Sequence, residues 1–274
     1  MSLALSKLGP VMLVGAGKMG VALARGWLDA GLPPSNLIIV HPRPGAALLE
    51  LAEDYELTLS TEASGLTPNV LVVGVKPQVM DGVLESLAPV IAPHTLVVSI
   101  AAGIDLARLA SKAGTQRIVR SMPNTPVQVR KGITGVVPGP DVAAEDRMAI
   151  DALFSASGMV VWLDEEPQID ALTAVSGSGP AYVFHMVEAL AAAGKRQGLP
   201  DAVAEQLARG TVVGAAALMD AGTVSPTVLR ENVTSPKGAT AAGLAVLMGE
   251  PGLTELMDST VNATRQRAEE LGRV

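Results

Sequence analysis

The sequence contains no cysteine, which excludes disulfide scaffolds, thiolate metal sites and cysteine nucleophiles together. Aromatic residues make up only 2% of the 274 residues, so a core has to be built from Ala, Val, Leu, Ile and Met. No apolar run reaches the roughly 20 residues that a membrane-spanning helix requires. The formal net charge of −7 argues against a nucleic-acid partner, which would need a basic face. We therefore expect a soluble cytoplasmic protein with neither a nucleic-acid nor a membrane partner.

The proportions of the other residues indicate a folded chain. Hydrophobic residues make up 49% and charged residues 17% of the sequence, so most of it should bury a core. The N-terminal stretch has no basic start, is interrupted by Lys7 and Pro10, and runs into a glycine turn. We therefore expect a first β-strand there and not a signal peptide.

The first half of the chain alternates between two kinds of segment. Short runs rich in β-branched residues predict strands, and segments between them, such as 19–31 and 79–91, have helical spacing. Runs that are apolar at consecutive positions are typical of parallel strands buried on both faces. We therefore predict a Rossmann-type, doubly wound α/β domain over residues 1–164, ending in a strand–helix–strand unit. The expected strands are 11–15, 36–40, 70–75, 95–100, 117–122, 132–137 and 159–164.

From about residue 165 the pattern changes to helices punctuated by Gly and Pro. We predict an all-α C-terminal dimerisation domain over residues 165–274. Residues 181–194 are apolar nearly all round, so a helix there has to be covered on more than one side. Such a helix is either the centre of this domain or part of a dimer interface, and we favour the interface.

The sequence GAGKMG (15–20) directly follows the first expected strand and opens the first expected helix. In this context the first glycine allows a tight turn, the second lets the backbone approach a pyrophosphate, and the third permits close packing of helix on strand. The phosphates would lie at the positive end of the helix. We predict dinucleotide binding, with a purely structural turn as the alternative. The candidate cofactor-binding residues here are Gly15, Gly17, Lys18, Met19 and Gly20.

The end of the second expected strand bears on the choice of dinucleotide. An NAD-binding domain usually has Asp or Glu there, which binds the ribose 2′-hydroxyl. This chain instead has His41 and Arg43. Arg43 would pair with a 2′-phosphate through charge-assisted hydrogen bonds, so we predict that NADPH is preferred over NADH. In the alternative interpretation Arg43 is a solvated loop residue.

Three short segments follow later strands, at the edge where doubly wound sheets bind ligands. They are VKPQ (75–78), SIAAG (99–103) and MPNTP (122–126), and each is alternatively a turn that only stiffens a loop. Lys76 is a candidate phosphate contact, carboxylate contact or proton donor, with a structural charge as the other interpretation. The candidates for contact with the cofactor are Val75, Lys76, Pro77, Ala101, Asn124 and Thr125.

Two segments of the helical half combine hydroxyl groups, glycine and proline. SGSGPAY (176–182) interrupts one helix and begins another at its proline. TSPKGAT (234–240) predicts a helix that is N-capped by Thr234 or Ser235. The amides of residues 238–240 would then be first-turn donors without partners, and such amides bind a carboxylate as readily as a phosphate. Without a ligand, both segments are simple helix starts.

The histidines and the remaining acidic residues give no sign of a catalytic or metal site. His41, His94 and His185 show no metal-ligand spacing, and no zinc-protease or serine-hydrolase motif is present. We interpret His185 as a packing or interface residue. We interpret Glu165 and Glu166 as a solvated turn between the domains.

The motifs VGAGKMG, GVKPQ, SIAAG, RSMPNTP, SGSGPAY and VTSPKGAT, in this order along essentially the whole chain, resemble those of pyrroline-5-carboxylate reductase. The resemblance implies NAD(P)H-dependent reduction of L-1-pyrroline-5-carboxylate to L-proline, the last step of proline biosynthesis. It also implies a helical domain that interlocks with a second subunit in a homodimer, and dimers that many members assemble into decamers. The competing interpretations are another imine or β-hydroxyacid reductase of the same plan and a non-catalytic dinucleotide sensor.

The resemblance also implies roles for individual residues. The loop matching 235–240 holds the substrate carboxylate, and Thr240 hydrogen-bonds the ring nitrogen. A ring iminium is already electrophilic, so the protein mainly has to position it, which agrees with the lack of a catalytic dyad. The family usually has glycine where this chain has Lys237, and lysine restricts a backbone that requires positive φ. The candidate substrate-binding residues are Ser178, Ser235, Gly238, Ala239 and Thr240, and the candidate catalytic residues are Thr240 and Lys76.

Overall fold

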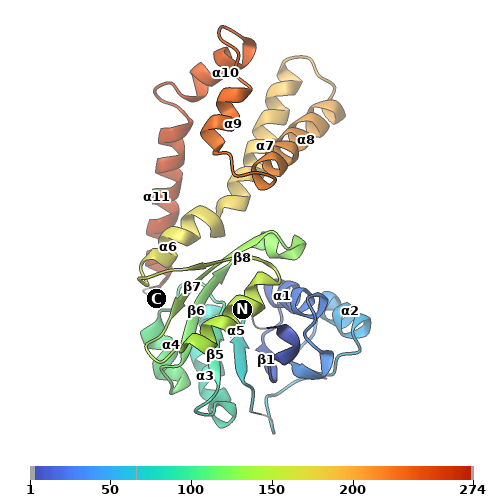
Figure 1. Ribbon diagram of the computed structural model, residues 1–274, viewed down its shortest axis with the longest axis vertical. Helices are drawn as coiled ribbons and strands as arrows, with labels where there is room; N and C mark the ends of the chain where they lie inside the picture. The colour runs from blue at the N-terminus through green and yellow to red at the C-terminus, as the bar shows by residue number, and fades with distance from the viewer. Residues whose placement is uncertain (1–3, 66, 273–274) are drawn as a thin grey trace. The chain divides into compact units, whose positions relative to one another are not determined.

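The computed structural model describes residues 4–65 and 67–272. They form two compact units (Figure 1). The sheet unit comprises the chain through Gly177 together with the end of the chain from Thr264, and the helical unit comprises Ser178–Ala263. Residues 165–177 therefore pack with the sheet unit, whereas the predicted domain boundary lies at residue 164.

The sheet unit is built on eight strands in the order β3-β2-β1-β4-β5-β6-β7-β8. Strand order reverses between β1 and β4, which is the switch point at which such sheets bind ligands. All neighbouring strands pair in parallel except β6 and β7. The predicted doubly wound fold is thus confirmed. The strands are β1 (Val11–Val14), β2 (Leu37–Val40), β3 (Leu59–Ser60), β4 (Val70–Val73), β5 (Leu96–Ser99), β6 (Ile118–Pro123), β7 (Gly132–Pro138) and β8 (Gly158–Trp162).

The antiparallel pairing of β6 with β7 departs from the parallel pairing that the apolar runs indicate. The connection between the two strands, residues 124–131, contains only the 3₁₀ helix η5 (Thr125–Val129). A parallel return requires a crossover of a dozen or more residues, so the chain can only turn back beside β6. The two-residue strand β3 was not predicted, because so short a run leaves no periodic pattern.

Helices cover both faces of the sheet and enclose two buried clusters. The burial of β1 shows why its sequence is apolar throughout: Val11 and Leu13 join one cluster, whereas Met12 and Val14 join the other. The first cluster includes side chains of α1 (Lys18–Asp29), α2 (Ala46–Asp54) and α5 (Ala144–Ser155), and the second includes those of α3 (Met80–Leu87) and α4 (Leu106–Ala113). Short 3₁₀ turns occur at η1 (Leu5–Lys7), η2 (Pro34–Asn36), η3 (Pro77–Val79) and η4 (Ala88–Val90).

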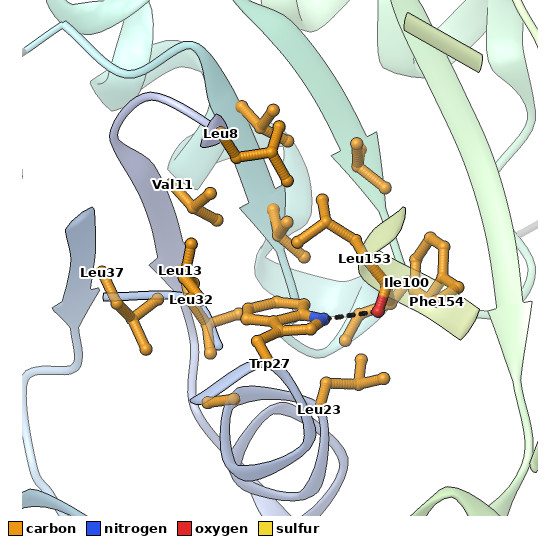
Figure 2. Close-up of a cluster of buried hydrophobic side chains, with 14 of the residues drawn as sticks. Leu8, Val11, Leu13, Leu23, Trp27, Leu32, Leu37, Ile100, Leu153 and Phe154 are labelled. Carbon is orange, nitrogen blue, oxygen red and sulfur yellow. Dashed lines mark hydrogen bonds between the residues drawn. The ribbon is translucent and has the colours of Figure 1, made fainter. Parts of the chain in front are cut away.

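Trp27 lies in the middle of the first cluster (Figure 2). Its side chain is fully buried, and its indole N–H donates to the carbonyl of Leu153 at 2.9 Å. A buried indole needs such an acceptor, because an unpaired N–H away from water is costly. This bond joins α1 to α5 across the chain and fixes the helix that follows the glycine turn.

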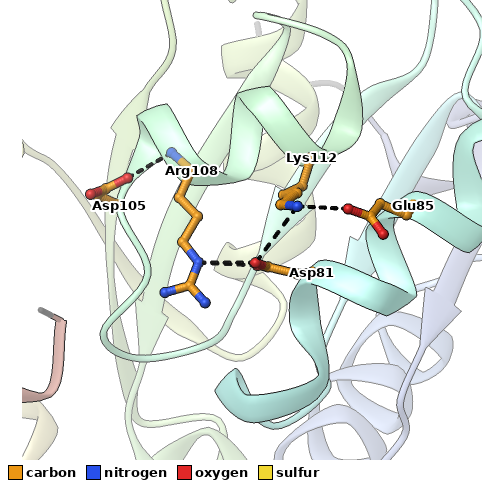
Figure 3. Close-up of polar contacts among 5 residues, drawn as sticks. All are labelled: Asp81, Glu85, Asp105, Arg108 and Lys112. Atoms are coloured by element: carbon orange, nitrogen blue, oxygen red, sulfur yellow. Dashed lines mark hydrogen bonds and ion pairs between the residues drawn. The ribbon is translucent and has the colours of Figure 1, made fainter. Parts of the chain in front are cut away.

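On the other face, ion pairs at the surface join α3 to α4 (Figure 3). Arg108 contacts Asp81 at 3.0 Å, and Lys112 contacts Glu85 at 2.6 Å. Asp105 caps α4 by accepting from the amide of Arg108 at 2.7 Å. Exposed pairs of this kind contribute little each, but the cap fixes where α4 begins.

Residues 168–177, the last part of the sheet unit before the chain enters the helical unit, are helical. They consist of α6 (Gln168–Leu172) and a π-helical turn, η6 (Thr173–Gly177). The helical unit then contains α7 (Gly179–Arg196), α8 (Asp201–Asp220), α9 (Pro226–Asn232), α10 (Ala239–Leu247) and α11 (Leu253–Gly272), whose last residues belong to the sheet unit. The all-α character predicted for this part is confirmed, and α7 packs against α8. Among the described residues, no helix has both the length and the hydropathy needed to cross a membrane.

Candidate functional site

The glycine turn between β1 and α1 has the geometry of a phosphate cradle. Gly15 has φ of +86°, and a Cβ on it would approach the Val75 side chain to 2.6 Å. Gly20 lies against the turn, with its Cβ position 3.1 Å from the carbonyl oxygen of Gly15. At Gly17 the space is open, because a Cβ placed there would have no contact within 4 Å among the described residues. The three glycines therefore meet three different requirements: a left-handed turn, open access and close packing.

The start of α1 leaves donors free for an anion. Its N-cap is Gly17, which provides no side-chain cap, and its first residues are Lys18 and Met19. The first amides of a helix have no partner within the helix, and the helix dipole adds positive potential there. Because no capping side chain occupies these amides in the described chain, they suit a phosphate.

The end of β2 provides a second polar group of the predicted site. The amide of His41 continues the sheet by donating to the Ser60 carbonyl at 2.8 Å. The Nδ1 atom of His41 is buried and has no hydrogen-bond partner among the described residues. Buried polar atoms are normally paired, so this nitrogen is suited to a group that the protein itself does not supply. Arg43, two residues further on, is exposed.

The loops after β4 and β5 adjoin the glycine turn at the switch point. A Cβ on Gly74 would lie 3.0 Å from the Gly15 carbonyl oxygen and 2.9 Å from the Ile100 side chain. Lys76 is the N-cap residue of η3, and its exposed side chain takes part in no ion pair of the described chain. Ala101 is buried, and its amide donates to the Ser99 hydroxyl at 3.3 Å. The structure thus brings together the predicted cofactor residues from three loops, including Val75 and Pro77 beside Lys76.

A cavity of about 460 Å³ opens beside these loops, within the sheet unit. Its walls are largely apolar, and two arginines line it, one from α4 and one from the end of α11. Arg108 and Arg267 were not predicted as site residues, because neither belongs to a motif and only the fold brings them together. The lining includes Pro77, Gln78, Ala102, Ile104, Arg108 and Arg267.

In the MPNTP segment, Asn124 and Thr125 lie in different surroundings. Asn124 is buried, and both ends of its carboxamide are bound within the chain. Its Nδ2 donates to the Ser176 carbonyl at 2.9 Å, and its Oδ1 accepts from the Ile133 amide at 2.8 Å. Thr125 is exposed at the start of η5. Of the two residues predicted to contact the cofactor, Thr125 is therefore the accessible one.

In the helical unit, the segment 235–240 is a tight turn followed by a helix. The Gly238 amide donates to the Ser235 carbonyl at 3.0 Å, and α10 begins at Ala239 with Gly238 as its N-cap. The predicted N-cap at Thr234 or Ser235 is therefore wrong, because Pro236 and Lys237 form the turn before the helix starts. Lys237 has φ of +61°. The Gly238 amide is engaged in the turn, whereas Ala239 and Thr240 begin the helix without a side-chain cap.

The other polar residues after residue 164 differ partly from the predictions. Ser178 is the N-cap residue of α7 and is half-buried, with no cap bond from its side chain. His185 is exposed and pairs with Glu188 on its own helix at 3.0 Å. Glu166 is not a solvated residue: its carboxylate accepts from the Leu106 amide at 2.7 Å and from Arg120 at 2.8 Å. Within the described chain, no three His, Asp or Glu side chains come together as metal ligands.

Two family models match the chain. Residues 166–271 match the model described as pyrroline-5-carboxylate reductase dimerisation, and residues 10–103 match the model described as NADP oxidoreductase coenzyme F420-dependent. The first match covers the helical unit and the segment leading to it. The second covers β1 to the loop after β5, which carries the glycine turn.

Full-length relatives agree with these matches. The chain is 39% identical to a pyrroline-5-carboxylate reductase of Pseudomonas aeruginosa over 265 residues, covering 95% of this chain and 96% of that protein. It is 40% identical to the corresponding reductase of Synechocystis, over 95% of this chain and 97% of the relative. Among solved structures, a pyrroline-5-carboxylate reductase from Coxiella burnetii superposes with a TM-score of 0.91 at 32% identity, covering 98% of this chain and 100% of that one.

A further solved structure bears on the cofactor. A pyrroline carboxylate reductase of Plasmodium falciparum with NADP bound superposes with a TM-score of 0.80 at 26% identity, over 97% of this chain and 99% of that one. The sheet unit therefore has the fold of an NADP-binding oxidoreductase domain, and the helical unit has that of a dimerisation domain. The fold, the glycine cradle and the relatives that match along the full length agree: the chain belongs to the pyrroline-5-carboxylate reductase family.

Proposed function

We propose that this chain reduces L-1-pyrroline-5-carboxylate to L-proline, with NADPH as the preferred reductant. The reaction follows from membership of the family over the full length of the chain. The observation that supports the site residues is the pair of glycine N-caps, at Gly17 before α1 and at Gly238 before α10. Each leaves first-turn amides uncapped, one set for phosphate and the other for carboxylate.

The cofactor half of the proposal rests on the sheet unit. The amides that follow Gly17 hold the pyrophosphate, with Lys18 and Met19 at the helix start. His41 Nδ1 and Arg43 bind the 2′-phosphate end, where an acidic residue would repel it. Thr125 and the loops at Val75–Pro77 and Ala101 hold the nicotinamide end. When bound, the nicotinamide cofactor supplies the hydride.

The substrate half rests on the turn before α10. The amides of Ala239 and Thr240 and the Ser235 hydroxyl hold the ring carboxylate, with Ser178 as a further contact. Gly238 gives the backbone close access, although its own amide is used in the turn. The Thr240 hydroxyl orients the ring nitrogen. Hydride addition to the protonated C=N group gives a secondary amine, and Lys76 either donates the proton that the imine nitrogen takes up or binds a carboxylate.

The role of Thr240 is tested with Thr240→Ala. We expect kcat/KM for the imine to fall by a factor equivalent to about 1–3 kcal/mol, because a polar contact to the ring nitrogen is lost. Binding of NADPH should not change. Thr227→Ala, another exposed threonine of the helical unit, is the matched control and should behave as the wild type. Equal steady-state constants for Thr240→Ala and the wild type would contradict the proposed role.

The cofactor preference is tested by measuring kcat/KM with NADPH and NADH, using the imine and an open-chain keto acid as control substrate. We expect NADPH to be favoured, and Arg43→Gln to lower kcat/KM for NADPH by about tenfold through loss of one charged contact. NADH has no 2′-phosphate, so its kinetics with the variant serve as the internal control. A wild-type preference for NADH would defeat the assignment of Arg43.

We also infer the assembly and location of the protein. The dimerisation domain indicates a homodimer. Assembly of dimers into a decamer, and a cytoplasmic location, extend this as proposals that rest on the family resemblance. Light scattering on the purified protein distinguishes a dimer from a decamer by mass.

A further inference from the structure

The side chain of Asn124 completes the pairing of β6 with β7 at the point where the main chain leaves the sheet. Pro123 is the last residue of β6, and the Asn124 amide still donates to the Ile133 carbonyl at 3.1 Å. The return bond from the Ile133 amide goes to Asn124 Oδ1, at 2.8 Å. The main-chain carbonyl of Asn124 has turned away and accepts instead from Val127, at 3.2 Å. One carboxamide oxygen thus replaces a ladder carbonyl while the chain turns into η5.

The other end of the carboxamide binds the π-helical turn η6. Nδ2 of Asn124 donates to the carbonyl of Ser176 at 2.9 Å. In a regular helix this carbonyl would accept from the residue four positions later, which is Pro180 and has no N–H. The amide after it, of Ala181, donates to Ser178 instead. Asn124 therefore supplies the Ser176 carbonyl with the hydrogen-bond donor that Pro180 cannot provide.

The segment that ends in η6 is also held at its beginning. Arg120, buried on β6, pairs with Glu166 at 2.8 Å and with Asp170 at 3.5 Å. Glu166 accepts from the first amide of α4 as well, at 2.7 Å. Close to the other end of the segment, Gly177 lies so near β6 that a Cβ on it would be 3.4 Å from the Met122 side chain. Strand β6 thus fixes residues 166–177 at both ends.

We propose that Asn124 is a positioning residue of the reaction, not a ligand of the cofactor. It fixes the backbone two residues before Ser178, where the chain enters α7, and so orients the segment that leads into this substrate-binding residue. The π-helical turn supports this, because such turns are rare and recur at functional sites. The inference rests on the proposed function, since it takes Ser178 and the segment after it as substrate-binding.

The test uses Asn124→Asp in the full-length protein at pH 8. The aspartate keeps the size of the side chain and the acceptor for Ile133, but it puts an oxygen in place of the donor to Ser176. We expect kcat with NADPH and the imine to fall by about 10- to 100-fold, because small displacements of reacting groups are costly. The dissociation constant of NADPH, measured by fluorescence, should stay within about threefold, and amides of residues 176–182 should exchange faster.

The matched control is Asn36→Asp. Asn36 also donates from Nδ2 to a backbone carbonyl, that of Leu8, at 2.9 Å, but in η2 at the start of β2. The Asn36→Asp variant should lose about as much thermal stability as Asn124→Asp and keep the kcat of the wild type. If Asn124→Asp does not fold, Asn124→Ser adds no charge but removes both carboxamide contacts, those to Ser176 and to Ile133.

Each result decides between roles for Asn124. A large rise in the NADPH dissociation constant would overturn the proposal in favour of a cofactor ligand. A fall in Tm alone, equal to that of Asn36→Asp and with kcat retained, would leave a purely structural role. If the wild type itself does not reduce the imine, the proposed function fails. The hydrogen exchange of the amides of residues 176–182 then still decides whether Asn124 fixes this segment. Unchanged exchange in Asn124→Asp would overturn that role as well.

Discussion

The two units bury their apolar residues to very different extents. The sheet unit encloses two clusters of buried side chains, whereas the buried hydrophobic residues described in the helical unit are Ala191, Ala204 and Ala208. Many large apolar side chains of the helical unit are exposed, among them Phe184 on α7, which is 63% exposed. An exposed apolar surface of this extent marks an interaction site. The sheet unit therefore has its own core, whereas the helical unit, which matches a dimerisation domain, exposes an apolar surface of the kind that interfaces use.

This difference bears on the two interpretations of residues 181–194, as the centre of a domain or as part of a dimer interface. A helix at the centre of its own domain would bury its large side chains, but α7 buries only Ala191 among its described residues. The family model that matches this region is that of a dimerisation domain. The exposed apolar side chains of α7 and this match both favour the predicted interface over a central core helix.

The largest effect is expected from removing the central side chain of the sheet unit. Trp27→Ala deletes a fully buried indole and leaves the Leu153 carbonyl without its donor. We expect a loss of about 3–5 kcal/mol in the free energy of unfolding, measured by circular dichroism in urea. Trp162→Ala is the control, because Trp162 is only partly buried on the edge strand β8 and should cost less. Equal losses for the two variants would mean that Trp27 is not central to the core.

A smaller effect, on dimerisation and not on folding, is expected from a substitution in the helical unit. Phe184→Asp places a charge on the exposed apolar face of α7, so it should leave the fold of the sheet unit intact and weaken dimerisation. We expect the dissociation constant of the dimer to rise by about 100-fold, equivalent to about 2.7 kcal/mol, in analytical ultracentrifugation. Phe184→Leu keeps the face apolar and should remain dimeric. A Phe184→Asp variant that dimerises as tightly as the wild type would place the interface elsewhere.

The contrast between the units also explains how much could be predicted from the sequence. The strands of the sheet unit were predictable because runs such as Val70–Val73 are buried on both faces and apolar at every position. The glycine turn was predictable because each glycine has a local backbone reason. The direction of β7 does not follow from the apolar pattern of its strand; it follows from the short connection before it, which leaves no room for a parallel crossover.

Contacts between distant residues were the part of the candidate site that could not be predicted. Asn124 has the appearance of a loop residue, and nothing near it in sequence indicates that Ser176 lacks a helical donor. Glu166 lies in an acidic segment that predicts a solvated turn, yet its carboxylate accepts hydrogen bonds from Arg120 and from the first amide of α4. The helix start at Ala239 was displaced from the prediction because a turn precedes it. In each case the deciding partner is set by the fold, not by the local pattern.

The smallest predicted effect compares one strained residue from each unit. Lys237 in the turn before α10 and Glu56 after α2 both have positive φ, of 61° and 55°. Each charge also opposes the dipole of its helix, lysine at an N-terminus and glutamate at a C-terminus. Glycine relieves about 1–2 kcal/mol of strain at such a position and loses about 0.5–1 kcal/mol through chain entropy. Lys237→Gly and Glu56→Gly should therefore each stabilise the protein by up to about 1 kcal/mol in thermal unfolding.

The kinetics of the same two variants then separate strain from function. Glu56→Gly should leave the steady-state constants unchanged. Lys237 is exposed and forms no ion pair in the described chain, so at physiological salt its removal should change the KM for the imine by less than about twofold. A several-fold rise in KM for Lys237→Gly that disappears in high salt would contradict this. It would show that the lysine adds attraction for the substrate carboxylate.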